Sequence, residues 1–163
     1  MSVPAADGGL DAWSALVAVY QSVLHDVVRA LEHGAGLDSG VFSALAYLAR
    51  AEPPGRLRLV VLQELMHPRY SQPGLSRLVQ RMEADGLVAR RADPADGRAT
   101  VLVMTRAGRA RYAKADVVYR AALRDAFGRH MTPGQARALE AALRPVARGR
   151  ANRASPSRTV RTG

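Results

Sequence analysis

The middle of the chain carries polar side chains with the spacing of one helix face. Gln72, Ser76 and Gln80 lie four residues apart. Arg77 and Arg81 form a parallel row beside them. Amide and hydroxyl groups can hydrogen-bond to base edges, and guanidinium groups can bind phosphate. This polar face predicts a nucleic-acid-reading surface, and the alternative is an ordinary solvated helix face.

A second candidate group lies further along the chain, between two strand-like segments. Residues 87–92 and 100–104 have strand composition and flank the sequence Asp-Pro-Ala-Asp-Gly-Arg at 93–98. Pro after Asp and the Asp–Gly pair are typical of hairpin turns, so the segments predict an antiparallel ribbon. Arg98 then lies at its tip, where a cation suits the narrow, negative minor groove of A·T-rich DNA. The alternative is a solvent-exposed turn residue.

Capping and apolar spacing predict the helix that presents the polar face. Ser71 is a suitable N-cap, and Pro73 in the first turn loses little by its missing N–H. Gly86 is a suitable residue just beyond the end of the helix. The buried face is predicted to comprise Leu75, Leu78, Val79 and Met82.

The elements on either side are predicted in the same way. Thr105 can cap a long helix, and Thr132 to Gln135 form a capping box that opens the last helix. The last helix is expected to turn Leu139, Leu143 and Val146 inward. The other predicted elements are a helix over 12–33, a helix capped by Asp38 or Ser39 with Phe42, Leu45 and Leu48 inward, a short strand at 56–59, and a short helix at 60–66.

Charge is distributed unevenly along the chain. The 163 residues hold 24 basic and 14 acidic side chains, for a net charge of +10. Residues 1–55 carry −4, residues 56–112 carry +6, residues 113–148 carry +4 and residues 149–163 carry +4. A polyanionic partner is therefore expected for the part that follows residue 55.

Other chemistry has little support in the sequence. The absence of cysteine excludes disulfides and thiol chemistry, and the hydrolase, P-loop and zinc-protease motifs are missing. His25, His33, His67 and His130 are scattered, without the spacing of a metal pair. We expect a protein that is not an enzyme and has no catalytic residue, cofactor or metal. Without a signal peptide or a membrane-spanning apolar run, a cytoplasmic protein with no membrane partner is expected.

The order of elements predicts a mainly α fold with a small β-wing, a winged helix-turn-helix flanked by N- and C-terminal helices. Three motifs carry a family resemblance: Gly74–Glu83 followed by Asp85–Val88, the wing D-P-x-D-x-R within Arg90–Arg98, and a strand ending in T-x-x-G within Leu102–Gly108. Together they resemble the MarR family of bacterial transcriptional regulators. The resemblance covers about residues 11–148.

The resemblance implies a homodimer that binds double-stranded DNA sequence-specifically, with recognition helices in successive major grooves and wing arginines in flanking minor grooves. A repressor on a pseudo-palindromic operator, with half-sites about 10 base pairs apart, is expected. The implied organisation is a disordered N-terminus over 1–10, dimerisation helices over 11–36 and 106–148, a DNA-binding lobe over 37–105, and a disordered basic tail over 149–163.

The resemblance also assigns roles to single residues. Gln72 can pair with adenine and Ser76 with several base edges. Arg77 and Arg81 could either contact phosphate or form an ion pair with Asp96, the residue that is expected to support the wing. Pro73 and Gly74 stand where family members often have longer polar residues, so fewer direct base contacts are expected there. The full set of candidate DNA-binding residues is Ser71, Gln72, Pro73, Gly74, Ser76, Arg77, Arg81 and Arg98.

Two further expectations concern partners. The family often binds small phenolic or other aromatic anions between the dimerisation helices and the DNA-binding lobe. The candidate lining of such an effector pocket is Trp13, Tyr20, His25, Phe42 and Tyr47, although residues of these types at helical spacing are more often simply core. A winged helix used for protein–protein contact is the alternative function, since folds do not fix functions.

Overall fold

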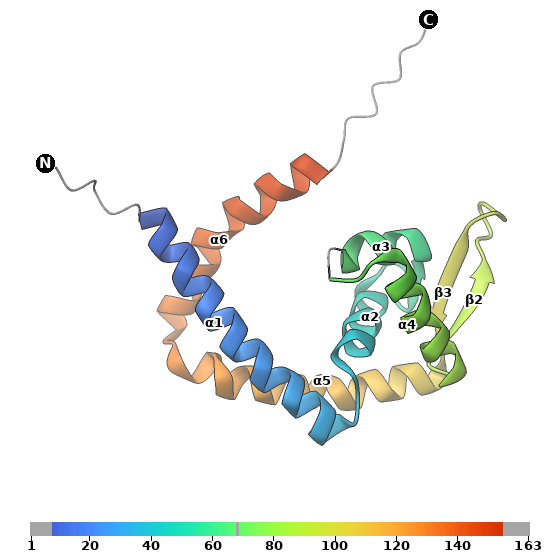
Figure 1. Cartoon of the computed structure of the whole chain (residues 1–163), viewed down its shortest axis with the longest axis horizontal. Helices are drawn as coiled ribbons and strands as arrows, with labels where there is room; N and C mark the ends of the chain where they lie inside the picture. The colour runs from blue at the N-terminus through green and yellow to red at the C-terminus, as the bar shows by residue number, and fades with distance from the viewer. Residues whose placement is uncertain (1–7, 68, 155–163) are drawn as a thin grey trace, which may run out of the picture. The chain divides into compact units, whose positions relative to one another are not determined.

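The computed structural model of the chain describes residues 8–67 and 69–154, with side chains described up to residue 147. The chain divides into two compact units, one up to Leu123 and one from Arg124 onward. The elements, labelled in Figure 1, are α1 (Gly8–Ala30), the π-helical turn η1 (Leu31–Ala35), α2 (Ser39–Arg50), β1 (Arg56–Arg58), α3 (Leu59–Met66), α4 (Gln72–Ala84), β2 (Val88–Ala92), β3 (Thr100–Met104), α5 (Arg106–Ala126), the 3₁₀ turn η2 (Gly128–His130) and α6 (Pro133–Ala154).

A three-stranded antiparallel sheet accompanies the helices of the first unit, in the order β1-β3-β2. In the β1–β3 ladder Arg56 pairs with Val103, and in the β2–β3 ladder Ala92 pairs with Thr100. β2 and β3 form the ribbon that projects beyond α3 and α4 in Figure 1, and we call this ribbon with its tip the wing. The expected mainly α fold with a small β-wing is confirmed.

The core of the first unit lies where α2, α3 and α4 meet the sheet. Leu45, Leu62, Val79 and Leu102, one from each of these elements, are fully buried. Phe42 and Leu48 are also buried, as the apolar spacing of α2 predicts. Asp38 caps α2 by accepting hydrogen bonds from the backbone N–H groups of Gly40 and Val41, at 2.9 and 3.1 Å.

Both outer helices are longer than expected. α1 begins at Gly8, so residues 8–10 are helical, and α6 runs to Ala154, so residues 149–154 are helical too. The physical reason is continuity: neither segment contains a proline, and each extends an established helix, which is easier than nucleating a new one. The rest of the two expected disordered ends, residues 1–7 and 155–163, lies outside the described residues.

The second unit leaves two apolar side chains of α6 exposed, whereas Leu139 is half-buried. Thr132 and Gln135 form the predicted capping box, with the Gln135 side chain 2.8 Å from the Thr132 backbone N–H. Leu143 and Val146, predicted to point inward, are 37% and 62% exposed. Within the described residues of this unit, α6 is accompanied only by η2 and the last turn of α5, which is too little to cover a whole helix face.

Candidate nucleic-acid interface and adjoining pocket

α4 presents the polar face that the sequence predicts. Ser71 caps the helix, accepting a hydrogen bond from the Gly74 backbone N–H at 3.3 Å, and Pro73 lies in the first turn. The predicted apolar face is buried on all four positions, Leu75, Leu78, Val79 and Met82. The candidate groups Gln72, Ser76, Arg77, Gln80 and Arg81 are exposed on the other side.

The junction between α4, the wing and α5 is tightly packed. Gly86 ends α4 with a left-handed backbone, φ 66°. The Thr105 hydroxyl donates to the Gly86 carbonyl at 2.6 Å and accepts from the Gly108 N–H at 2.9 Å. A Cβ on Gly108 would overlap the carbonyl oxygen of Leu87. This close approach explains why the T-x-x-G motif needs glycine at its last position.

The tip of the wing is shaped by two aspartate side chains. Asp93 Oδ1 accepts from the Ala95 N–H at 2.9 Å, and Asp96 Oδ1 accepts from the Arg98 N–H at 3.1 Å. The Asp93 N–H closes the loop on the Ala99 carbonyl at 2.9 Å. The Ala99 N–H bonds to the Asp96 carbonyl at 2.8 Å, so a backbone turn is centred on Gly97 and Arg98, and the antiparallel ribbon predicted from the Asp–Gly pair is confirmed. Side-chain bonds to nearby backbone N–H groups add to this turn.

An ion pair joins the wing to the rest of the sheet. Arg58 Nε of β1 lies 2.6 Å from Asp93 Oδ2. The pKa of the Asp93 carboxyl is below its usual value because the Ala95 N–H and the Arg58 guanidinium both stabilise the carboxylate. Asp96, the expected wing support, bonds within the tip instead. Arg58 could not be identified from the sequence, because nothing local shows that β1 lies beside the base of the wing.

The basic residues of α4 differ in their partners. Arg81 Nη2 lies 3.2 Å from Asp38 Oδ1 at the start of α2, so its ion pair is with Asp38 and not with Asp96. Arg77 is exposed. Glu83 of α4 binds β2, accepting from the Arg90 N–H at 3.2 Å while its Oε2 lies 2.9 Å from Arg90 Nε. The α4 helix that carries the polar face and the wing are thus parts of one connected lobe.

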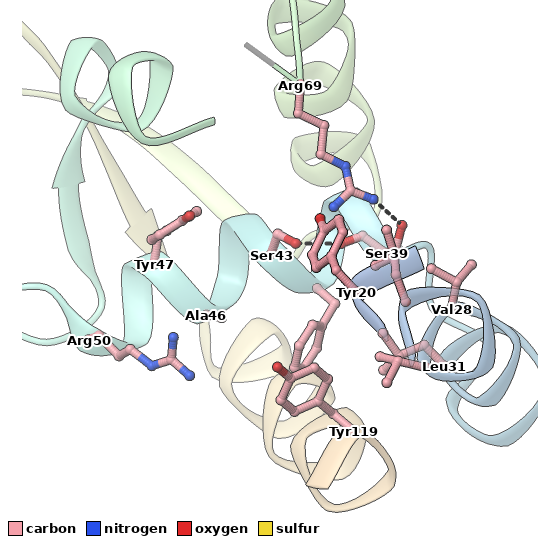
Figure 2. A pocket seen from close by; sticks show the side chains of 13 residues that line it. Tyr20, Val28, Leu31, Ser39, Ser43, Ala46, Tyr47, Arg50, Arg69 and Tyr119 are labelled. Carbon is pink, nitrogen blue, oxygen red and sulfur yellow. Dashed lines mark hydrogen bonds between the residues drawn. The ribbon is translucent and has the colours of Figure 1, made fainter. Parts of the chain in front are cut away.

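An open pocket of about 240 Å³ adjoins this lobe, between α1, α2 and α5 (Figure 2). Three of the five candidate effector-pocket residues, Tyr20, Phe42 and Tyr47, line it. Trp13 and His25 are exposed elsewhere on α1 and are not among its lining residues. The residues that sequence reasoning missed are Leu24, Val27, Val28, Leu31, Ser39, Ser43, Ala46, Arg50, Arg69 and Tyr119.

The polar lining of the pocket is cationic and aromatic. Arg50 and Arg69 are its charged members, and no acidic side chain is among the lining residues. The Phe42 and Tyr119 rings lie 4.8 Å apart, centre to centre. Arg69 Nη2 donates to Ser39 Oγ at 3.1 Å, a contact drawn in Figure 2. Aromatic walls with two guanidinium groups can hold a planar anion.

Among the described residues, no three His, Cys, Asp or Glu side chains come close enough together to hold a metal ion. Within the same ranges, no helix combines the length and apolarity needed to cross a membrane.

The helices α2, α3 and α4, followed by the β2–β3 wing, define a winged helix-turn-helix protein. Residues 35–99, which contain α4 and most of the wing, match the model of the MarR family. Over these residues the chain is similar to the MarR family, and its fold is that of MarR family transcriptional regulators. No curated protein is significantly similar to it in sequence.

Solved structures support the same assignment. AbsC, a MarR family transcriptional regulator from Streptomyces coelicolor, is 25% identical, with a TM-score of 0.77 over 93% of this chain and 99% of that one. Sco3205 from the same organism, solved in complex with DNA, is 25% identical with a TM-score of 0.74 over 91% of both chains. BpsR from Bordetella bronchiseptica, whose DNA binding is regulated by 6-hydroxynicotinic acid, shares the fold at 22% identity and a TM-score of 0.66, over 90% and 96%.

Proposed function

We propose that the protein is a dimeric, sequence-specific double-stranded-DNA-binding regulator that acts as a repressor. The observation that carries the proposal is the exposed polar face of α4 on the same lobe as a wing tipped by Arg98. A helix with this face fits a major groove, and a cation on a projecting ribbon fits the adjacent minor groove. Bound to an operator that overlaps a promoter, such a protein blocks transcription.

Charge and the comparison with Sco3205 support this reading. The net charge of +6 over residues 56–112 attracts phosphate, whereas residues 1–55 carry −4 and suit a position away from DNA. The corresponding lobe of Sco3205 belongs to a protein solved with DNA. Residues 37–105 are accordingly proposed as the DNA-binding lobe. Ser71, Gln72, Ser76 and Arg77 are its proposed major-groove residues, with fewer contacts from Pro73 and Gly74.

The outer helices are proposed to form the dimer. Trp13, Val117 and Val146, on α1, α5 and α6, are 60%, 69% and 62% exposed. Exposed apolar side chains on each of these helices favour association with a second chain. Residues 11–36 and 106–148 are therefore the proposed dimerisation helices.

A charged substitution tests the dimer. Wild type is expected to sediment at twice the chain mass of 17.5 kDa, and Val117→Lys at the mass of one chain, because a buried, unpaired ammonium group opposes association. Val60→Lys is the matched control, since Val60 is 53% exposed on α3, which is not one of the three proposed dimerisation helices. Equal behaviour of the two variants would remove Val117 from the interface.

The pocket is the proposed site of a small aromatic or phenolic anion that modulates DNA affinity. Tyr20, Phe42 and Tyr47 supply ring contacts, and Arg50 and Arg69 supply the counter-charge. A ligand alters DNA affinity only if it prefers one arrangement of the lobe over another. BpsR is a protein of the same fold whose DNA binding responds to such a small aromatic acid.

DNA binding is tested by fluorescence-anisotropy titration on the intergenic duplex that flanks the protein's own gene and on a scrambled duplex, each at several salt concentrations. We expect tighter binding to the first by at least about 10³-fold, with a steep salt dependence from phosphate contacts. Equal, weak and salt-sensitive binding to both, and to every other duplex drawn from the same genome, would mean that net charge alone is responsible. That result would overturn the proposal and favour a winged helix used for protein–protein contact.

A further inference from the structure

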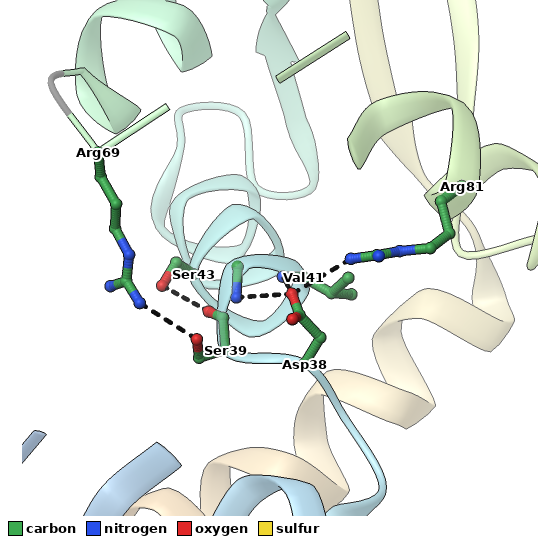
Figure 3. Close-up of polar contacts among 7 residues, drawn as sticks. Asp38, Ser39, Val41, Ser43, Arg69 and Arg81 are labelled. Carbon is green, nitrogen blue, oxygen red and sulfur yellow. Dashed lines mark hydrogen bonds and ion pairs between the residues drawn. The ribbon is translucent and has the colours of Figure 1, made fainter. Parts of the chain in front are cut away.

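The arginines of the first unit differ in whether their guanidinium groups already have a partner. Figure 3 shows two that bind the start of α2. Arg69 Nη2 donates to Ser39 Oγ at 3.1 Å, and Arg81 Nη2 lies 3.2 Å from Asp38 Oδ1. Arg56 of β1 is different, because its guanidinium group has no hydrogen bond or ion pair among the described residues. Such a group is available to a partner outside the chain.

Arg56 lies on the side of the three-stranded sheet that faces away from the core. Side chains that pair across neighbouring strands share a face, and the face alternates along each strand. Leu57 pairs with Leu102, and both pack in the core, so the residues on either side of them along the strands point the other way. We call that opposite side the outer sheet face. It comprises Arg56, Arg58, Ala89, Arg91, Val101 and Val103.

The burial of Val101 shows how the arginines lie on this face. Val101 is 5% exposed, although it is not a member of the core cluster. It pairs with Arg58 on one side and with Arg91 on the other. The aliphatic stems of long basic side chains cover apolar surface while their charged ends stay in water. The two flanking stems therefore account for the burial of Val101, and they hold the guanidinium groups close to the sheet.

The outer sheet face carries more positive than negative charge. Arg58 is compensated, because its Nε lies 2.6 Å from Asp93 Oδ2. Arg91 Nη1 donates to the Arg90 carbonyl, a neutral acceptor, at 3.0 Å. Arg56, two residues from Arg58 along β1, has no ion pair within the part of the chain that the structure describes. Hydrogen bonds from guanidinium to an anion are roughly twice as strong as neutral ones, so this face suits an anionic partner.

The place of this face on the ribbon favours DNA as that partner. Arg91 pairs with Val101, which lies three residues beyond Arg98, so Arg91 stands about 10 Å behind the wing tip. The minor groove is about 7.5 Å deep, so a side chain set back by that distance reaches the rim, where the phosphates lie, when Arg98 is in the groove. Because α4 packs on the core side of the sheet, the outer sheet face is turned toward the rim further from α4.

We propose that Arg56 and Arg91 form a phosphate-binding site on the outer sheet face. The site binds the DNA backbone outside the operator core, on the far side of the minor groove that Arg98 enters. Arg56 and Arg91 are on the two outer strands, about 10 Å apart across the sheet, so each binds its own phosphate. The Arg58–Asp93 ion pair lies between them and keeps the ribbon beside β1. The inference rests on the proposed DNA-binding function and assigns a further site to it.

The test varies the DNA on the outer side of that minor groove. Anisotropy titrations of the full chain compare two duplexes with the same operator, one that ends at this groove and one that continues for about one helical turn on each side. Hydroxyl-radical footprinting of the wild type locates the groove. A third duplex has the longer flanks but carries uncharged methylphosphonates in place of the phosphates at the outer rim.

The variant to compare with wild type is the double substitution Arg56→Gln and Arg91→Gln. Glutamine keeps part of the stem that lies over the sheet and removes the charge. The matched control is Arg124→Gln with Arg129→Gln, which removes two charges from exposed positions in the second unit. It corrects for the loss of long-range attraction to DNA, which does not depend on where the charges lie on the outer sheet face.

Wild type is expected to bind the long duplex about 10-fold more tightly than the short one. Its salt dependence should be steeper on the long duplex, by about 0.9 in the logarithmic slope for each added phosphate contact. The variant with Arg56→Gln and Arg91→Gln is expected to bind the two duplexes within about 2-fold of each other. The control should lose the same factor on both duplexes and keep the gain. Methylphosphonates should remove the gain of wild type and leave the variant unchanged.

Three results would overturn the inference. The first is equal affinity of wild type for the short and long duplexes, the second is a full gain in the variant with Arg56→Gln and Arg91→Gln, and the third is a full gain of wild type on the methylphosphonate duplex. Failure of the proposed function is visible separately, as a lack of preference for the operator over a scrambled duplex of equal length. A wild type that prefers its operator but gives one of the three results keeps the DNA-binding function and loses the outer phosphate site.

Discussion

Gly108→Ala is expected to destabilise the native chain by about 3 kcal/mol, the upper end of the usual cost of overpacking. Gly108 is buried in the first turn of α5, and a Cβ there would overlap the Leu87 carbonyl oxygen. That oxygen accepts from the Thr105 N–H at 3.0 Å, so it cannot retreat without loss of a hydrogen bond. The added methyl group must therefore move backbone at the junction of α4, the wing and α5.

The sign of this effect distinguishes close packing from helix propensity. In an unconstrained helix, alanine is better than glycine by about 1 kcal/mol, so propensity alone predicts stabilisation. Denaturant unfolding of wild type and variant at one protein concentration measures the difference. Gly97→Ala is the control, because a Cβ there meets nothing within 4 Å and φ is not positive. A Gly108→Ala variant as stable as wild type would contradict the packing at this junction.

Local signals in the sequence were sufficient to predict the buried face of α4 and the N-caps of α4 and α6. The apolar period of α4 placed Leu75, Leu78 and Val79 in the core, because a helix that packs on one face needs that spacing. Ser71 and Thr132 were found as caps, since their hydroxyls bond to N–H groups only three residues away. Such contacts depend on neighbours along the chain and can be read without a tertiary structure.

Contacts between distant segments could not be read in this way. Arg81 and Asp38 are 43 residues apart, and Arg58 and Asp93 are 35 apart. Arg81 was assigned to phosphate or to Asp96 because both are chemically reasonable partners of an arginine. Only the packing of α4 on the start of α2 selects Asp38. The Asp–Gly pair was enough to predict the wing hairpin, but the side-chain bonds of Asp93 and Asp96 that help to shape its tip were not predicted.

Three of the five residues predicted to line the pocket do so, and helix geometry explains why the other two do not. Tyr20 lines it together with Leu24, Val27, Val28 and Leu31, which share one face of α1 and η1. Trp13 is seven residues before Tyr20, about 10 Å along the helix axis, which carries it past the pocket. His25 lies on another face of α1. Aromatic character suggested both residues, but position along and around the helix excludes them.

Arg98→Ala is expected to weaken operator binding by about 1–3 kcal/mol, or roughly 5- to 150-fold in Kd, without unfolding the protein. The wing tip is held by the Arg98 backbone N–H, which bonds to Asp96 and survives the substitution. The side chain is exposed and is therefore free to enter a minor groove. Its loss removes one cation, so the salt dependence should also become shallower by about one counterion.

Minor-groove insertion makes a sharper prediction than loss of charge. Wild type should prefer an operator with A·T-rich flanks over one with G·C-rich flanks, because the narrower A·T groove concentrates negative potential. Arg98→Ala should lose that preference while it keeps discrimination in the core of the operator, which α4 reads. Arg124→Ala removes the same charge from an exposed position in the second unit and should leave the flank preference intact. If both variants lose equal affinity on both operators, Arg98 acts through net charge, and the wing contributes no groove contact through this residue.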